Sequence, residues 1–226
     1  MADHYIYSPE TIVKAYSLGL FPMADSHDSL HVKFYDPDRR ALIPIDHSLG
    51  RGVHIPRRLQ RRVRQAPYEV TLDQDFTAVI DACAAPSEQR TDTWINRDIR
   101  QLYIALHKMG FAHSIEVWSD GALIGGLYGV ALRAAFFGES MFSRKNDASK
   151  IALVHLMARL RHGNFLLLDA QFTNDHLQQF GVTEIDRSEF QGRLAEALAS
   201  NGDLHFDTPS AALVMPYLDQ LAKHQA

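Results

Sequence analysis

The apolar run Phe-Leu-Leu-Leu at residues 165–168 is followed at once by two polar residues, Asp169 and Gln171. Side chains alternate between the two faces of a β-strand, so Asp169 and Gln171 are expected to point to the same face. Ligands of α/β proteins bind at the carboxyl ends of strands. A carboxylate beside an amide at such a strand end therefore predicts a ligand-binding site rather than ordinary core packing.

Glu139 is a second acidic residue in apolar surroundings, because Phe136 and Phe137 precede it and Met141 and Phe142 follow it. A carboxyl group in such surroundings must find a partner or remain neutral. Two roles are open for Glu139: a structural salt bridge with an arginine, or the binding of a cationic ligand.

The strongest electrostatic feature is the basic stretch at residues 51–64, with no acidic residue between Asp46 and Glu69. Arginines three and four positions apart on a helix repel each other by about 0.2–0.5 kcal/mol per pair, and an anionic partner would reverse that sign. A solvated basic face is the alternative. The residues predicted to bind RNA are Arg51, Arg57, Arg58, Arg61, Arg62 and Arg64.

Trp94 lies at an expected loop-to-helix junction, in the sequence Thr-Trp-Ile-Asn-Arg at residues 93–97. An aromatic ring beside an arginine can stack on a nucleic-acid base, which is worth about 1–3 kcal/mol. The alternative is a tryptophan packed in the core under a helix start.

Composition sets broad limits on the class of protein. The chain has 226 residues, 46% of them apolar, and a net charge of −4, so bulk charge does not predict a nucleic-acid partner. The single cysteine, Cys83, cannot form an internal disulfide and lies in an Ala-rich stretch, which favours a small buried apolar residue. The sequence shows no signal-peptide pattern and no apolar run long enough for a membrane span, so we expect a soluble cytoplasmic protein.

Several kinds of site lack their sequence patterns. The twelve histidines show no zinc-ligand spacing, so no metal and no cofactor are expected. The sequence contains neither a Gly-x-Ser-x-Gly nucleophile elbow nor a phosphate-binding loop.

The periodicity predicts a mixed α/β (α+β) fold. Expected helices cover residues 9–19, 57–64, 76–84, 96–109, 147–161 and 188–198, with a short one from 174. Expected strands cover residues 68–72, 112–118, 123–132, 134–137 and 182–185, besides the strand that leads to Asp169. The sequence before residue 65 is basic and rich in expected loops, whereas the sequence after it is predicted to form regular helices and strands. We therefore expect a small N-terminal domain at 1–65 and a larger catalytic domain at 66–226.

The chain resembles the leucyl/phenylalanyl-tRNA–protein transferase family of bacteria over roughly residues 8–198. The matching pieces are long and occur in order. They are Gly-Leu-Phe-Pro at 19–22, Thr-Trp-Ile-Asn-Arg at 93–97, Ala-His-Ser-Ile-Glu-Val-Trp at 112–118, Gly-Gly-Leu-Tyr-Gly-Val at 125–130, Phe-Gly-Glu-Ser-Met-Phe-Ser at 137–143 and Leu-Asp-Ala-Gln-Phe-Thr-Asn at 168–174.

The resemblance implies an enzyme that transfers Leu or Phe, and less readily Met, from aminoacyl-tRNA to a protein with an N-terminal Lys or Arg. The product would be an N-degron for degradation by a Clp protease. The resemblance also implies a small N-terminal domain and a C-terminal domain similar to the acetyltransferase (GNAT) fold.

The family's functional residues can be placed on this sequence by their motifs. Its Asp-x-Gln pair falls on Asp169 and Gln171, its tRNA-adenosine tryptophan on Trp94, and its substrate-site glutamate on Glu139. We also expect Asn174, in the same motif, to contact substrate. The apolar pocket for the Leu or Phe side chain maps onto Leu127, Phe136, Met141, Val154, Leu156, Leu160 and Leu168, here called the apolar set; at helical spacing, those from residues 154–160 would also suit an ordinary core.

Two motifs depart from the family pattern. Many members have Phe-Pro-Trp where this chain has Met23 as the third residue, and some have Trp-Trp where this chain has Phe34 and Tyr35. The first departure removes one expected aromatic contact, and the second keeps aromatic character.

Aminolysis of a tRNA ester is downhill, so neither ATP nor a covalent intermediate is required. Positioning two reactants supplies up to about 7–11 kcal/mol, whereas deprotonating an α-amine at pH 7 costs about 1 kcal/mol. We therefore expect Asp169 mainly to orient the α-amine, with proton acceptance as a second role, and Gln171 to hold the ester or the amine. Glu139 is the first candidate for binding the acceptor's Lys or Arg side chain.

Two other functions fit parts of the sequence. A GNAT acetyltransferase would need a glycine-rich loop to hold the pyrophosphate of CoA, and the corresponding residues 144–149, Arg-Lys-Asn-Asp-Ala-Ser, have no glycine. A non-catalytic tRNA-binding module would explain the arginines but would not need the pair of Asp169 and Gln171.

Overall fold

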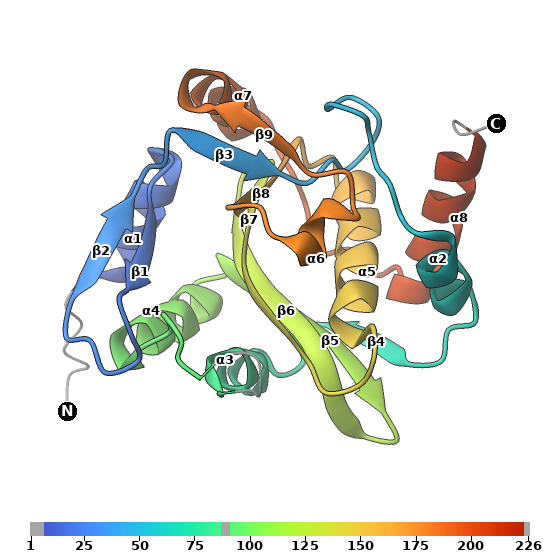
Figure 1. Ribbon diagram of the computed structural model, residues 1–226, viewed down its shortest axis with the longest axis horizontal. Coiled ribbons are helices and arrows are strands. Elements are labelled where there is room, and N and C mark those ends of the chain that lie inside the picture. The colour runs from blue at the N-terminus through green and yellow to red at the C-terminus, as the bar shows by residue number, and fades with distance from the viewer. Residues whose placement is uncertain (1–6, 87–90, 224–226) are drawn as a thin grey trace.

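A seven-stranded sheet in the order β4-β5-β6-β7-β8-β3-β9 runs through the protein (Figure 1). The computed structural model describes residues 7–86 and 91–223. Every neighbouring pair of strands is antiparallel except β7 and β8, which are parallel. The strands are β3 (Arg39–Leu42), β4 (Glu69–Leu72), β5 (Ala112–Ser119), β6 (Ala122–Leu132), β7 (Ala135–Ser143), β8 (Leu167–Gln171) and β9 (Thr183–Asp186).

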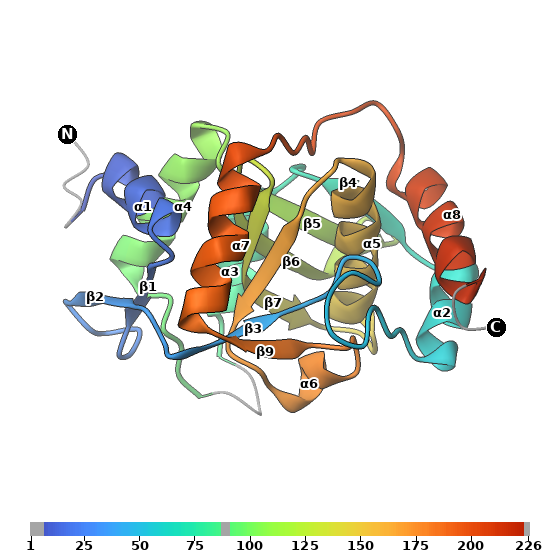
Figure 2. The ribbon, with the colours of Figure 1, turned by 90° about the horizontal axis from the view of Figure 1, so that it is seen from above.

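Helices cover both faces of this sheet and enclose two apolar cores (Figures 1 and 2). On one face lies α5 (Ala148–His162), with α2 (Arg57–Arg64) and α8 (Ser210–Lys223) packed outside it. The other face carries α1 (Pro9–Ser17), α3 (Phe76–Ala84), α4 (Arg97–Lys108) and α7 (Arg187–Ala199). The predicted mixed α/β class is confirmed. Among the described residues, no helix combines the length and apolar character that a membrane span requires.

Local sequence signals place most helix starts. The side chains of Ser8, Asn96 and Asn174 accept hydrogen bonds from the backbone N–H three residues on, which caps α1, α4 and the short helix α6 (Asp175–Gln178). Asp147 occupies the cap position of α5, but its side chain makes no capping bond and its φ is +64°. Ser143 supplies a side-chain acceptor instead, because its hydroxyl accepts from the backbone N–H of Ser149 over 3.0 Å.

Strand β7 is longer than the sequence indicates. The expected strand ends at Phe137, whereas β7 continues to Ser143 because it pairs with β6 as far as Gly125. The register shifts between Tyr128 and Gly129, where Glu139 is the extra residue on β7. Such β-bulges redirect side chains and are common next to active sites.

The sheet extends across the expected domain boundary at residue 65. Strand β3 lies between β8 and β9, and α2 packs on α5. A separate antiparallel pair, β1 (Phe21–Ala24) and β2 (Val32–Tyr35), lies at the edge of the molecule with α1 (Figure 1). The division of the chain into 1–65 and 66–226 stays a prediction, and residues 39–64 contribute to the same cores as the rest.

One buried ion pair joins β3 to β8. The Arg40 guanidinium donates from Nε and Nη2 to the two carboxylate oxygens of Asp169, over 2.9 and 2.7 Å. Arg40 is 1% exposed and Asp169 is fully buried. Removing one partner of such a pair leaves a buried charge without compensation.

We expect Arg40→Met to lower the free energy of unfolding by about 3–5 kcal/mol, because the Asp169 carboxylate would lose its counter-charge. Urea unfolding measures this change. The matched control is Arg39→Met, since Arg39 pairs with Asp186 over 2.6 Å on the surface and exposed pairs contribute about 0–1 kcal/mol. Equal losses in the two variants would contradict the role assigned to the buried pair.

Candidate functional site

The Asp169 carboxylate is held by four hydrogen bonds at the end of β8. Arg40 supplies two of them, and Gln171 supplies the others from its backbone N–H to Oδ1 (2.9 Å) and from Nε2 to Oδ2 (3.2 Å). Two oxygens of an ionised carboxylate offer about four acceptor positions. In this arrangement an α-amine could contact Asp169 only by replacing one of these donors.

The side-chain amide of Gln171 has its orientation fixed by Asp169. A carboxylate only accepts hydrogen bonds, so the –NH₂ group of Gln171 must face Asp169, and Oε1 must face the other way. Gln171 also has a φ of +58°, in the left-handed region. Left-handed backbone in a residue other than glycine costs energy and is concentrated at functional sites. The expected proximity of Asp169 and Gln171 is confirmed.

Arg40 is a residue of the cluster that sequence analysis missed. Its third nitrogen, Nη1, donates to the Gly19 carbonyl over 2.9 Å. The rings of Phe21 and Phe190 lie 4.6 and 4.4 Å from the guanidinium carbon. The only signal in the sequence is a charged residue at the start of an apolar stretch, and its partner lies 129 positions further on.

Strands β7 and β8 separate beside this cluster. They pair from Ala135 and Leu167 as far as Phe137 and Asp169. Beyond that point β7 continues with β6 alone, and β8 ends at Gln171. Residues 138–142 of β7 are half-buried, and Phe172 after β8 is exposed. We call this separation the strand split; it leaves the Gln171 end of β8 without a partner on the β7 side.

Glu139 lies on β7 at the strand split. Its two carboxylate oxygens accept hydrogen bonds from the hydroxyl groups of Tyr16 (2.6 Å) and Tyr103 (2.8 Å). The two tyrosine hydroxyl groups also hydrogen-bond to each other. Both tyrosines lie within the expected helices at 9–19 and 96–109, where helical spacing does not distinguish a hydroxyl partner from a core ring.

Burial raises the pKa of Glu139 to about 7, and the nearby negative charge of Asp169 adds to the rise. The hydrogen bonds from Tyr16 and Tyr103 and the positive charge of Arg40 oppose it. Glu139 therefore exchanges a proton near neutral pH, which an ordinary carboxyl group with a pKa near 4.3 does not do.

The apolar set lies mainly in the core on the α5 face of the sheet. Met141 is half-buried at the strand split, and Leu168 lines a cavity of about 120 Å³. The other members are almost fully buried: Leu127, Phe136, Val154, Leu156 and Leu160. Glu139, by contrast, bonds to tyrosines of the opposite core. Contact between the apolar set and a substrate side chain stays a prediction.

Trp94 and Asn174 both take part in local structure. The Trp94 carbonyl accepts from the backbone of Ala24 (3.4 Å), which ties the loop before α4 to β1, and its half-buried ring packs at the edge of the core. Asn174 caps α6 through its side chain. Their expected contacts with substrate remain predictions.

The predicted RNA-binding arginines fall into two groups. Arg62 lies over the ring of Tyr68 and donates to its hydroxyl group (2.9 Å), and Arg64 pairs with Asp219 of α8 (2.7 Å). The other four are exposed and have no ion pair within the part of the chain that the structure describes: Arg51, Arg57, Arg58 and Arg61. These four are the better candidates for contact with an anion.

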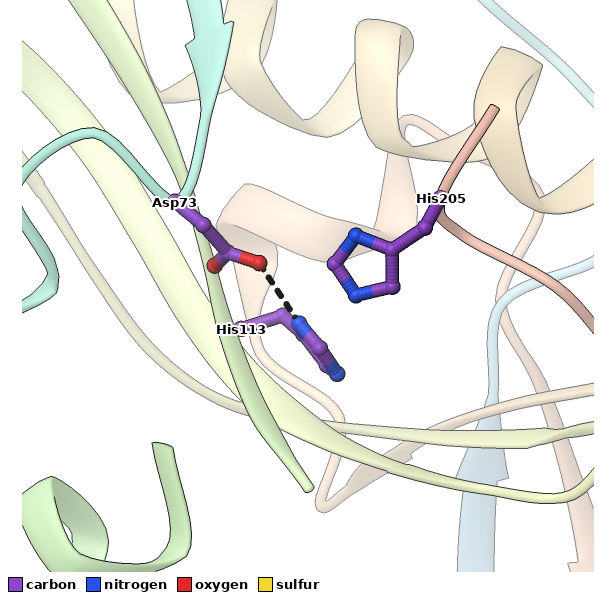
Figure 3. Close-up of side chains that lie close together, drawn as sticks. All are labelled: Asp73, His113 and His205. Carbon is purple, nitrogen blue, oxygen red and sulfur yellow. Dashed lines mark hydrogen bonds and ion pairs between the residues drawn. The ribbon is translucent and has the colours of Figure 1, made fainter. Parts of the chain in front are cut away.

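Asp73, His113 and His205 come together on another part of the protein, although no metal-ligand spacing was present in the sequence (Figure 3). Their possible ligand atoms lie within 4.8 Å of one another. However, Nδ1 of His113 lies 2.7 Å from Asp73, and Nε2 lies 3.1 Å from the Gly110 carbonyl. Both nitrogens thus face oxygen atoms, so a metal would have to displace one of these contacts.

The protonation of Glu139 should be visible in protein stability. A folded pKa of about 7 against 4.5 for the free group means that the folded state binds more protons between these pH values. The carboxyl group therefore costs stability as pH rises through this window. As the pH rises from 5 to 8, the free energy of unfolding of Glu139→Gln should therefore increase by about 1–3 kcal/mol relative to that of the parent protein.

Urea unfolding of both proteins at a series of pH values measures this difference. Glu189→Gln is the matched control, because Glu189 is exposed on α7 and pairs with Arg193. A difference for Glu139→Gln that stays flat with pH would contradict the raised pKa.

Comparison with known proteins identifies the family. The family model for leucyl/phenylalanyl-tRNA protein transferase matches residues 49–195, and the model for its N-terminal domain matches residues 6–38. Proteins named leucyl/phenylalanyl-tRNA–protein transferase are similar along most of the chain. The protein from Hyphomonas neptunium is 54% identical over 199 residues, covering 88% of this chain and 75% of its own. The protein from Phenylobacterium zucineum is 52% identical over 199 residues, covering 88% of each chain.

These matches confirm the resemblance seen in the sequence motifs. The match over residues 49–195 includes both Asp169 and Glu139. The chain therefore belongs to the leucyl/phenylalanyl-tRNA–protein transferase family and is an aminoacyltransferase.

Proposed function

We propose that this protein transfers Leu or Phe, and less readily Met, from aminoacyl-tRNA to the N-terminal Lys or Arg of acceptor proteins. Family membership supports the reaction class. The observation that carries the proposal is the polar cluster at the strand split, where Gln171 is oriented by Asp169 and Glu139 has a pKa of about 7.

The reaction joins the acceptor's α-amine to the carbonyl carbon of the aminoacyl ester. The new C–N bond forms as the C–O bond to the ribose of the tRNA breaks, and the amine loses a proton. An α-amine has a pKa of about 7.7–8.0, so a substantial fraction is protonated at pH 7. The site must therefore position two reactants and accept one proton.

Asp169 acts in this proposal through Gln171. Its buried carboxylate holds Gln171 at the backbone N–H and at Nε2, so that Oε1 is directed away and can accept a hydrogen bond from the incoming amine. Fixing the amine next to the ester provides the larger share of the rate enhancement, as expected for a reaction controlled by orientation.

Glu139 can accept the proton. A proton moving from an ammonium group of pKa about 8 to a group of pKa about 7 climbs about 1.4 kcal/mol. The binding of a Lys or Arg side chain by Glu139 is the second candidate role. A bound cation would lower the pKa of Glu139 and favour the ionised form.

The wider biological role belongs to the same proposal. The acceptor protein with its added N-terminal Leu or Phe would carry an N-degron for degradation by a Clp protease. The reaction would take place in the cytoplasm. A GNAT-like C-terminal fold is part of this proposal. The support for these statements is the family resemblance.

The direct test measures transfer of labelled Phe from Phe-tRNA to peptides that differ only in the first residue. We expect transfer to Arg- and Lys-ended peptides and at least about tenfold less to an Ala-ended peptide, because one ionic contact is worth about 1.5–3 kcal/mol. Acetyl-CoA is the control substrate. Transfer of acetyl groups, or tRNA binding without transfer of Phe, would contradict the proposal.

Glu139→Gln separates the two roles of Glu139 when kinetics are measured from pH 6.5 to 9. If Glu139 accepts the proton, kcat falls at low pH and recovers toward pH 9, where the amine is neutral without help. A raised KM for Arg-ended peptides at every pH would instead indicate side-chain binding. Gln171→Ala should lower kcat at all pH values, since it removes the positioning group.

A further inference from the structure

A basic pocket with a volume of about 530 Å³ lies beside α5. It is bounded by α2, the end of β7, the first turn of α5 and the short helix α6. Four cationic side chains line it, against one carboxylate, that of Asp147; the four are Arg58, Arg144, Lys145 and Lys150. The lining therefore carries a net charge of +3.

Three of these cations have no carboxylate partner within the described ranges 7–86 and 91–223: Arg58, Arg144 and Lys145. Arg144 donates to the Leu123 carbonyl over 2.9 Å, and Lys145 donates to the Ser119 hydroxyl over 3.0 Å. Neutral acceptors of this kind leave the positive charges uncompensated. An anion in the pocket would compensate them.

The first turn of α5 borders the same pocket, and its N–H groups at Ala148 and Ser149 already donate to the Lys145 carbonyl (3.1 Å) and the Ser143 hydroxyl (3.0 Å). Asp147 makes no capping bond, and its carboxylate lies 3.2 Å from Lys150 instead. The helix start still carries the partial positive charge of the helix dipole, which favours an anion nearby. His176 from α6 also lines the pocket, and its buried Nε2 has no hydrogen-bond partner among the described residues. Burial and the charge of Lys150 lower the pKa of His176, so the ring is neutral at pH 7 and still has an N–H to donate.

The basic pocket is connected to the strand split through β7 and α6. Ser143, in the pocket lining, ends the same strand that carries Glu139, and α6 begins four residues after Gln171. On its other side the pocket includes Arg58 of the basic helix α2. The pocket therefore borders both the basic helix α2 and the end of the strand that carries Glu139.

We propose that the basic pocket binds the backbone phosphates of the single-stranded 3′ end of aminoacyl-tRNA. This inference rests on the proposed function, because it takes the RNA ester as the substrate at the strand split. The double-stranded part of the RNA would lie on α2, and the phosphates before the terminal nucleoside would occupy the pocket. Phosphate contacts of this kind position a nucleic acid without reading its sequence.

Three donors of increasing length test the inference: Phe-adenosine ester without phosphate, the Phe ester of the trinucleotide CCA, and Phe-tRNA. Lys145→Gln and Arg58→Gln should each lower kcat/KM at least about tenfold for the trinucleotide and for tRNA. For Phe-adenosine the change should stay below about twofold, because that donor has no phosphate to bind. Lys145→Arg should restore part of the loss.

Lys108→Gln is the matched control, since Lys108 is exposed at the end of α4 on the opposite face of the sheet. Each removed phosphate contact should also reduce the slope of log affinity against log salt by about 0.7. Equal losses on Phe-adenosine would show that the residues act through the fold, and losses on tRNA alone would assign them to the RNA duplex. Either result, or no loss at all, would overturn the inference.

Calorimetry with the unacylated trinucleotide tests the pocket without any transfer reaction. We expect the parent protein to bind it about tenfold more tightly than Lys145→Gln does. If the parent protein transfers Phe from no donor but shows this difference in binding, the proposed function fails and the pocket inference survives. Tighter binding of CoA or pyrophosphate than of the trinucleotide would assign the pocket to a different phosphate compound and overturn the inference.

Discussion

The buried ion pair between Arg40 and Asp169 is the interaction on which the rest of the site depends. Taking two charges out of water is costly, and such a pair is favourable only when every donor and acceptor is satisfied. Here Arg40 bonds to Asp169 and to the Gly19 carbonyl, and Gln171 satisfies the remaining positions of the carboxylate. The pair thereby ties the turn after α1, strand β3 and the end of β8 into one unit.

The environment gives the two carboxylates of the cluster different properties. Asp169 faces a full positive charge and four donors, whereas Glu139 faces the hydroxyl groups of Tyr16 and Tyr103. Neutral donors offset burial less than a guanidinium does, so the pKa of Glu139 rises to about 7.

Local signals in the sequence predicted most elements, and long-range pairing explains the rest. The helix at Arg57–Arg64 and the caps at Ser8 and Asn174 follow from residues close together in the chain. The position of β3 between β8 and β9 does not, because its pairing partners lie more than 120 positions away. The same limit hid Arg40 and the tyrosine partners of Glu139, while the short Asp-x-Gln spacing of Asp169 and Gln171 was enough to predict their proximity.

The strand split lies between two groups of residues on opposite faces of the sheet. Glu139 and its tyrosines belong to the core under α1 and α4, whereas the apolar set and the basic pocket lie on the α5 side. A continuous sheet has no opening for a substrate to touch both faces, since its strands are only about 4.8 Å apart. Pairing of β7 with β8 stops at Phe137 and Asp169, and Glu139 lies on the face of Phe137, away from the apolar set. In the proposed function, an ester at the split would direct its amino-acid side chain toward the apolar set on the α5 side and hold its reacting carbonyl beside Gln171.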